Sequence, residues 1–128
     1  MSTFARIAKI LLFLAYVAGI AWLCFGTFTP DPDIPRTIFG IPTDKCVHFA
    51  MFLPFPILGT LAFDFRSWWR PLCIMTLLAN LSAFTLEHLQ SRITTTRITD
   101  PTDLNANILG ITLGLLVAIL IGLFRKKQ

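Results

Sequence analysis

The sequence has 128 residues, of which 55% are hydrophobic and 14% are charged, and its mean hydropathy is +0.70. A soluble domain of this size needs a more highly charged surface, so the composition excludes an ordinary soluble globular protein. The net charge is +4, but the basic residues are scattered at the ends of apolar runs and form no basic–aromatic patch. This pattern excludes nucleic acid as a partner and indicates membrane topology instead.

The hydrophobic residues form four long blocks, which predict transmembrane helices over about 10–27, 45–63, 71–90 and 103–124. We therefore expect an all-α fold, in which residues 1–128 form one domain, an integral membrane four-helix bundle with antiparallel spans. The first block follows basic residues, as a signal peptide does. It is long, however, and no small-x-small cleavage site follows it, so we interpret it as the first span.

Basic residues are divided unequally between the two ends of this bundle. One end carries Arg6, Lys9, Arg66, Arg70, Arg125, Lys126 and Lys127. The other end carries Arg36, Lys45, Arg92 and Arg97. Because short loops rich in Lys and Arg remain in the cytoplasm, we expect both termini to be cytoplasmic.

Prolines and tryptophans mark a kink, a loop and a connection in the predicted fold. Pro54 and Pro56 remove two backbone donors inside the second block, so we expect a kink whose freed carbonyls face protein. Residues 28–43 contain further prolines and are expected to be an extended outer loop. Trp68 and Trp69 lie in the short connection between the second and third blocks, where we interpret them as interfacial anchors.

Polar side chains collect at three helix ends that this topology brings to the outer face. They are Asp44, Lys45 and His48; Glu87, His88 and Gln90; and Arg97, Asp103 and Asn107. Ionisable groups in the terminal turns of a span are costly when they face lipid, so we expect one inward-facing polar pocket. Capping, snorkelling or a buried structural histidine remain alternatives for the first three residues.

Helical spacing also puts Asp103, Asn107, Gly110 and Gly114 on one stripe of the fourth span. Small residues on such a stripe favour close packing against a neighbouring helix. No metal or other cofactor is expected: Cys24, Cys46 and Cys73 lack metal-ligand spacing, and a set made of Asp44, His48, Glu87 and Asp103 matches no known signature.

The order and spacing of these polar residues resemble those of a known family. The matching residues are Thr29-Pro30, Asp44-Lys45-x-x-His48-Phe49, Glu87-x-x-Gln90, Arg97, Asp103, Asn107 and Gly110. Together they resemble the VanZ-like family of small polytopic bacterial membrane proteins, whose named member is associated with resistance to teicoplanin, a lipoglycopeptide. The resemblance implies a role in the cell envelope, at the inner membrane. The loop before Arg97 lacks the Pro-Gly of the family, so Arg92 remains an alternative for the motif arginine.

Two functions compete for the predicted pocket. In the first, it binds the headgroup of an amphiphile, either a lipid-linked envelope intermediate or a lipoglycopeptide, through Asp44, Lys45, Gln90, Arg97, Asp103 and Asn107. In the second, it is a membrane enzyme in which His48 and Glu87 act as an acid–base pair on an envelope lipid. A transporter is less favoured because no charged group lies deep in a span. An oligomer of this chain is left open.

Overall fold

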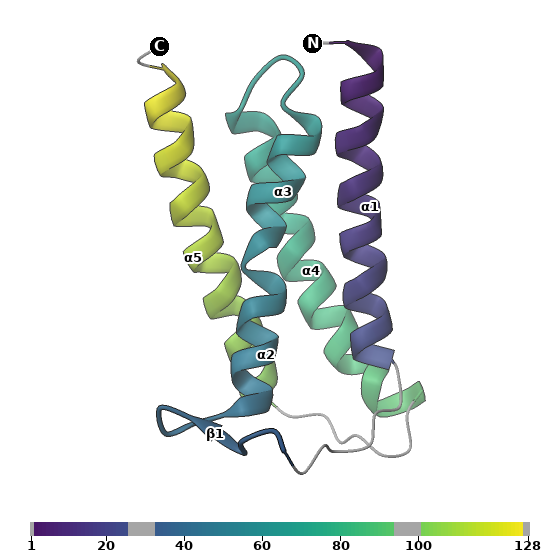
Figure 1. Cartoon of the computed structure of the whole chain (residues 1–128), viewed down its shortest axis with the longest axis vertical. Helices are drawn as coiled ribbons and strands as arrows, with labels where there is room; N and C mark the ends of the chain where they lie inside the picture. The colour runs from purple at the N-terminus through teal and green to yellow at the C-terminus, as the bar shows by residue number, and fades with distance from the viewer. Residues whose placement is uncertain (1, 26–32, 94–100, 127–128) are drawn as a thin grey trace.

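The structure, a computed structural model, describes residues 2–25, 33–93 and 101–126. It contains four helical spans that are long and apolar enough to cross a membrane, at Thr3–Phe25, Thr43–Phe63, Trp69–Gln90 and Thr102–Arg125. The predicted all-α bundle of four spans is confirmed. In Figure 1, α1 (Thr3–Phe25) begins and α5 (Pro101–Lys126) ends at the same end of the bundle, here called the terminal end. We call the opposite end, where α2 begins, the hairpin end.

The first span begins earlier than its apolar block, at Thr3 rather than near residue 10. The reason is local, because the Ser2 hydroxyl accepts a hydrogen bond from the Ala5 backbone N–H at 3.2 Å, as a helix N-cap does. Arg6 and Lys9 therefore lie within the first turns of the helix. Hydropathy alone could not place this boundary, since it reports on lipid contact and not on capping.

The second span is broken at the prolines into α2 (Thr43–Phe52) and α3 (Pro54–Phe63), which confirms the predicted interruption. Carbonyl groups near the break contact neighbouring helices. The Tyr16 hydroxyl of α1 donates to the Met51 oxygen, and the Phe49 and Leu53 oxygens point at glycines of α5. A break of this kind is stable at membrane depth only when neighbouring helices cover it, and here they do so from two sides.

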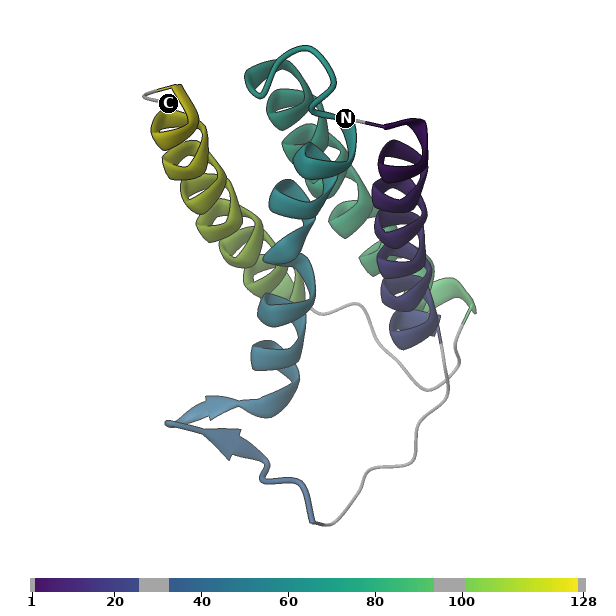
Figure 2. The ribbon, with the colours of Figure 1, turned by 45° about the horizontal axis from the view of Figure 1, so that its top comes forward.

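A short β-hairpin precedes α2, which the sequence analysis did not predict. Strands β1 (Thr37–Ile38) and β2 (Ile41–Pro42) pair antiparallel, with Thr37 opposite Pro42. The turn between them has φ of 52° at Phe39 and 79° at Gly40, the double positive φ of a two-residue type I′ turn. Figure 2 shows the hairpin projecting sideways from the start of α2, away from the helices.

The apolar core lies where α1, α3 and α4 (Trp69–Ile93) meet, and it is rich in aromatic side chains. Phe13 of α1 meets Phe55 of α3 edge to face, with ring centroids 5.4 Å apart. Small residues of α4, Ala79 and Ala83, are fully buried beside them. Since α1 contributes only a few buried side chains, most of its surface is left to face lipid.

The position of Trp68 differs from the interfacial one predicted from the sequence. Trp68 is buried, with 8% of its surface exposed, and its indole N–H donates to the Ala118 carbonyl of α5 at 2.8 Å. It is a packing residue at the terminal end rather than an interfacial anchor. Nearby, the buried carboxylate of Asp64 accepts from Arg125 at 2.8 Å and lies 3.5 Å from the Lys9 ammonium. These contacts connect α1, the α3–α4 turn and α5.

Candidate functional site

An ion pair joins α2 to α5 at the hairpin end. The Lys45 ammonium donates to the Asp103 carboxylate, and it also lies 3.2 Å from the carboxylate of Asp44. The side chains of Lys45 and Asp103 are 17% and 16% exposed, whereas that of Asp44 is 62% exposed. Asp103 also lies in the first turn of α5, where a negative charge stabilises the helix dipole. The pair is therefore largely shielded, and only Asp44 is open to the surroundings.

His48 lies one turn deeper and is buried between two side chains of α5. Its Nδ1 lies 3.0 Å from the Asn107 side-chain oxygen, and its Nε2 lies 3.6 Å from the Asp103 carboxylate. With the amide oxygen as acceptor, Nδ1 carries the hydrogen. His48 and Asn107 are only 7% and 2% exposed. We call Asp44, Lys45, His48, Asp103 and Asn107 the α2–α5 polar cluster.

Two glycines fix the register of this cluster. A Cβ added at Gly110 would overlap the Phe49 carbonyl oxygen, and one added at Gly114 would overlap that of Leu53. The backbones of α2 and α5 thus touch next to the cluster, on the side away from the hairpin end. This contact confirms the predicted role of the stripe in close packing. Because the helices are fixed there, Asp103 and Asn107 on the same stripe must face Lys45 and His48.

Glu87 and Gln90 both lie on α4, and Gln90 joins that helix to α1. Both are buried, with 3% and 4% of their surface exposed. The Gln90 side-chain amide donates to the Cys24 carbonyl at 2.8 Å, in the last turn of α1. This hydrogen bond links α4 to the last turn of α1, where helix carbonyls commonly accept from side chains. The residues that face the two ring nitrogens of His48 are Asn107 and Asp103, not Glu87.

The arginine of the predicted site is not placed by this structure. Arg97 lies outside the described residues, and Arg92, its alternative, is exposed in the last turn of α4. The described part of the chain holds no group of three or more His, Cys, Asp or Glu side chains arranged to bind a metal ion.

An apolar groove begins at Lys45, and the sequence analysis missed it. Its volume is about 430 Å³, and its lining comes from the end of the hairpin, α2 and α5: Ile41, Lys45, Cys46, Phe49, Thr102, Asn105, Ala106 and Leu109. The spacing of the α5 residues, 102, 105, 106 and 109, is that of one helix face beside the polar stripe. That spacing was readable in the sequence, but the facing residues of α2 were not.

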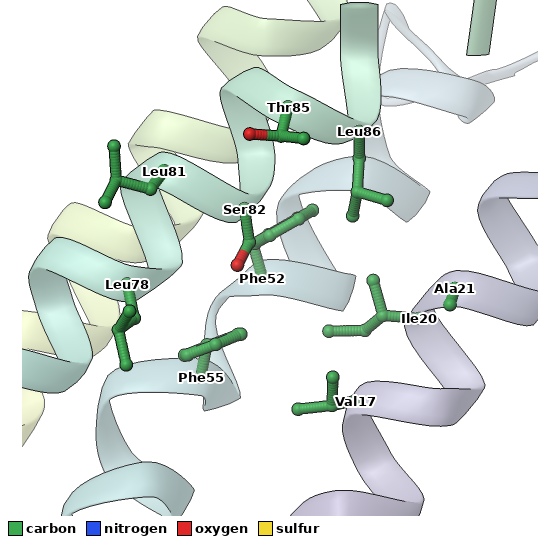
Figure 3. Close-up of a pocket in the computed structure, with 10 residues that line it drawn as sticks. All are labelled: Val17, Ile20, Ala21, Phe52, Phe55, Leu78, Leu81, Ser82, Thr85 and Leu86. Carbon is green, nitrogen blue, oxygen red and sulfur yellow. The ribbon is translucent and has the colours of Figure 1, made fainter. Parts of the chain in front are cut away.

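A second cavity, of about 290 Å³, lies between α1 and α4 (Figure 3). Val17, Ile20 and Ala21 line it from α1, and Phe52 and Phe55 line it from either side of the proline break. The wall from α4 is made of Leu78, Leu81, Ser82, Thr85 and Leu86. Its lining includes two hydroxyl groups but no charged residue.

Comparison with known proteins identifies the family. Residues 28–122 match the family model described as VanZ/LLP1. The chain belongs to the VanZ/LLP1 family. With its four apolar spans, it is a multi-pass membrane protein of that family. No match was found among curated proteins or among solved structures. The match includes every residue of the α2–α5 polar cluster as well as Glu87, Gln90 and Arg97.

Proposed function

We propose that this VanZ-like protein binds the headgroup of an amphiphile at the α2–α5 polar cluster, on the extracytoplasmic face of the inner membrane. The ligand class is a lipid-linked envelope intermediate or a lipoglycopeptide antibiotic, and binding contributes to glycopeptide resistance. The distribution of Lys and Arg supports this orientation, since it leaves both termini in the cytoplasm. The association with teicoplanin resistance belongs to the family, and we extend it to this protein as part of the proposal.

The observation that carries the proposal is an ion pair beside an apolar groove. Lys45 belongs to both, since it contacts Asp103 and lines the groove. Phosphate and acyl oxygens would be recognised by the ammonium group, and hydroxyl or amide donors would be recognised by the exposed Asp44 carboxylate. A headgroup with both kinds of group is complementary to this arrangement.

The geometry of His48 favours binding over catalysis. A general base needs one ring nitrogen within hydrogen-bonding reach of the substrate. Both nitrogens of His48 face side chains of α5, and the ring is buried. In the proposed function His48 and Asn107 hold α5 against α2, so that Lys45 and Asp103 keep their positions. Arg97 is proposed as a second cationic partner of the headgroup.

The test is native mass spectrometry of the purified protein with three amphiphiles: a polyprenyl diphosphate sugar, teicoplanin, and phosphatidylglycerol as the bulk lipid. We expect one of the first two to be retained in competition with phosphatidylglycerol. Lys45→Met should abolish this retention, because it removes the cation at the groove. Arg36→Met, at an exposed basic residue beside the hairpin, is the control and should retain the ligand. Equal retention of all three amphiphiles by the wild type would refute the proposal.

A further inference from the structure

We infer that the hydrocarbon chain of the ligand lies in the groove between α2 and α5, which runs from the hairpin toward the middle of the spans. The inference rests on the proposed function, because it takes the polar cluster as the site of the headgroup. The inference adds the position of the ligand's hydrocarbon chain, which the polar residues alone do not specify. The occupant is a single acyl or prenyl chain attached to a headgroup that carries a phosphate or acyl oxygen.

The lining of the groove is almost entirely apolar, and its charged residue, Lys45, lies toward one end. Lys45, Thr102 and Asn105 lie toward the hairpin end, where α2 and α5 begin, and Phe49, Ala106 and Leu109 lie further along the helices. Ligand sites typically combine a mostly apolar wall with a few polar groups that fix the orientation of the ligand. A hydrocarbon chain is complementary to this apolar wall, and a headgroup attached at its hairpin end would lie beside Lys45 and Asp44.

The groove is continuous with the lipid-facing surface of the spans. Leu109, on the α5 wall, is 63% exposed, and Ile41, on the hairpin, is 53% exposed. A hydrocarbon chain can therefore enter sideways from the bilayer without the helices separating. The volume of about 430 Å³ falls within the range of ordinary ligand sites, about 300–1,000 Å³.

The cavity between α1 and α4 is the rival location for the chain. It lies between two attachments of α1, the Tyr16 bond to Met51 and the Gln90 bond to Cys24 (Figure 3 shows its lining). None of the described residues that line it is charged, so these residues offer an ionic headgroup no partner. The charge of Lys45 is what favours the α2–α5 groove.

Two cysteines make the inference directly testable. Cys46 lines the groove, whereas Cys73 is exposed on α4 and lines neither cavity. The probe ligand is hexadecyl phosphate, which combines a phosphate with one saturated chain. We expect it to slow maleimide modification of Cys46 in the wild-type protein by about tenfold at ten times its Kd, by mass action. Modification of Cys73, read in the same digest by mass spectrometry, should not change.

Two matched variants test where the hydrocarbon chain of the ligand binds. Ala106→Leu fills the groove, and Ala21→Leu fills the α1–α4 cavity. We expect Ala106→Leu to weaken hexadecyl phosphate binding at least about tenfold and to abolish protection of Cys46, and Ala21→Leu to leave both unchanged. The reverse result would place the chain between α1 and α4 and overturn the inference. If Ala106→Leu does not fold, the Cys46 and Cys73 rates of the wild type decide the matter.

The failure of this inference differs from the failure of the proposed function. If Lys45→Met loses the ligand while Cys46 remains unprotected in the wild type, the headgroup site stands and the groove assignment is wrong. If neither Lys45→Met nor Ala106→Leu changes binding, the proposed function itself fails. Equal protection of Cys46 and Cys73 would indicate general partition of the probe into detergent and would also overturn the inference.

Discussion

The second span packs against α5 and against α1 through different kinds of contact. Toward α5, the α2 backbone touches glycines, and ionic and amide contacts lie at the hairpin end. Toward α1, the contacts described are aromatic rings and the Tyr16 hydrogen bond to Met51, with a cavity beside them. The difference shows that the α2–α5 contact permits little movement, because backbone atoms cannot repack as side chains do. The polar cluster is built on this more rigid contact.

The largest expected effect comes from adding one carbon to the α2–α5 contact. A Cβ at Gly114 would overlap the Leu53 oxygen and lie 3.2 Å from Pro56 Cδ, so Gly114→Ala must separate two backbones. We expect it to lower the free energy of unfolding by about 3 kcal/mol. The control is Gly19→Ala on α1, where the added carbon meets no other helix or side chain of the described residues within 4 Å. That variant should gain up to about 1 kcal/mol from helix propensity. SDS titration measures both, and equal responses would contradict the contrast.

The next effect tests the ionic part of the same contact. Lys45→Met leaves the partly buried Asp103 without its cation, and we expect a loss of about 2 kcal/mol, less than for a fully buried pair. Adding Asp103→Leu to Lys45→Met should recover most of that loss, because no lone charge remains. Asp44→Asn, at an exposed carboxylate, should cost less than about 1 kcal/mol. A double-mutant cycle measures the coupling, and additive losses would show that the pair does not stabilise the fold.

A smaller effect is expected on the side of α1. Gln90→Met removes the donor to the Cys24 carbonyl and replaces the amide with an apolar side chain of similar length. We expect a loss of about 1 kcal/mol, accompanied by faster hydrogen exchange confined to the last turn of α1. His88→Leu, at an exposed position of the same helix, is the control. Faster exchange throughout α5 would mean that Gln90 supports the whole bundle and not only α1.

The smallest effect tests the proline break. Tyr16→Phe removes the hydroxyl that donates to the Met51 oxygen and keeps the aromatic ring packed against Phe55. We expect a loss of about 0.5–1 kcal/mol, since the net contribution of one hydrogen bond is of this size. Hydrogen exchange of α2 and α3 should rise near the break. No change in either measurement would mean that the contacts with α5 alone stabilise the break.

Much of the architecture could be predicted from the amino-acid sequence. The four spans follow from hydropathy, because every residue that faces lipid must be apolar whichever helix lies behind it. The break at Pro54 follows from the missing backbone donors, and the common face of Asp103, Asn107, Gly110 and Gly114 follows from the period of the helix. Each of these properties belongs to one helix and needs no knowledge of its neighbours.

Only the tertiary structure decided which faces meet. The burial of Trp68 against Ala118, the contact of Gln90 with α1 rather than with the α2–α5 polar cluster, and the groove beside Lys45 all depend on how helices are rotated about their own axes. Hydropathy carries little information on that rotation in a membrane, where lipid and protein interior are similarly apolar. The rotation is determined by where two backbones can touch, and in this protein that place is at the glycines of α5.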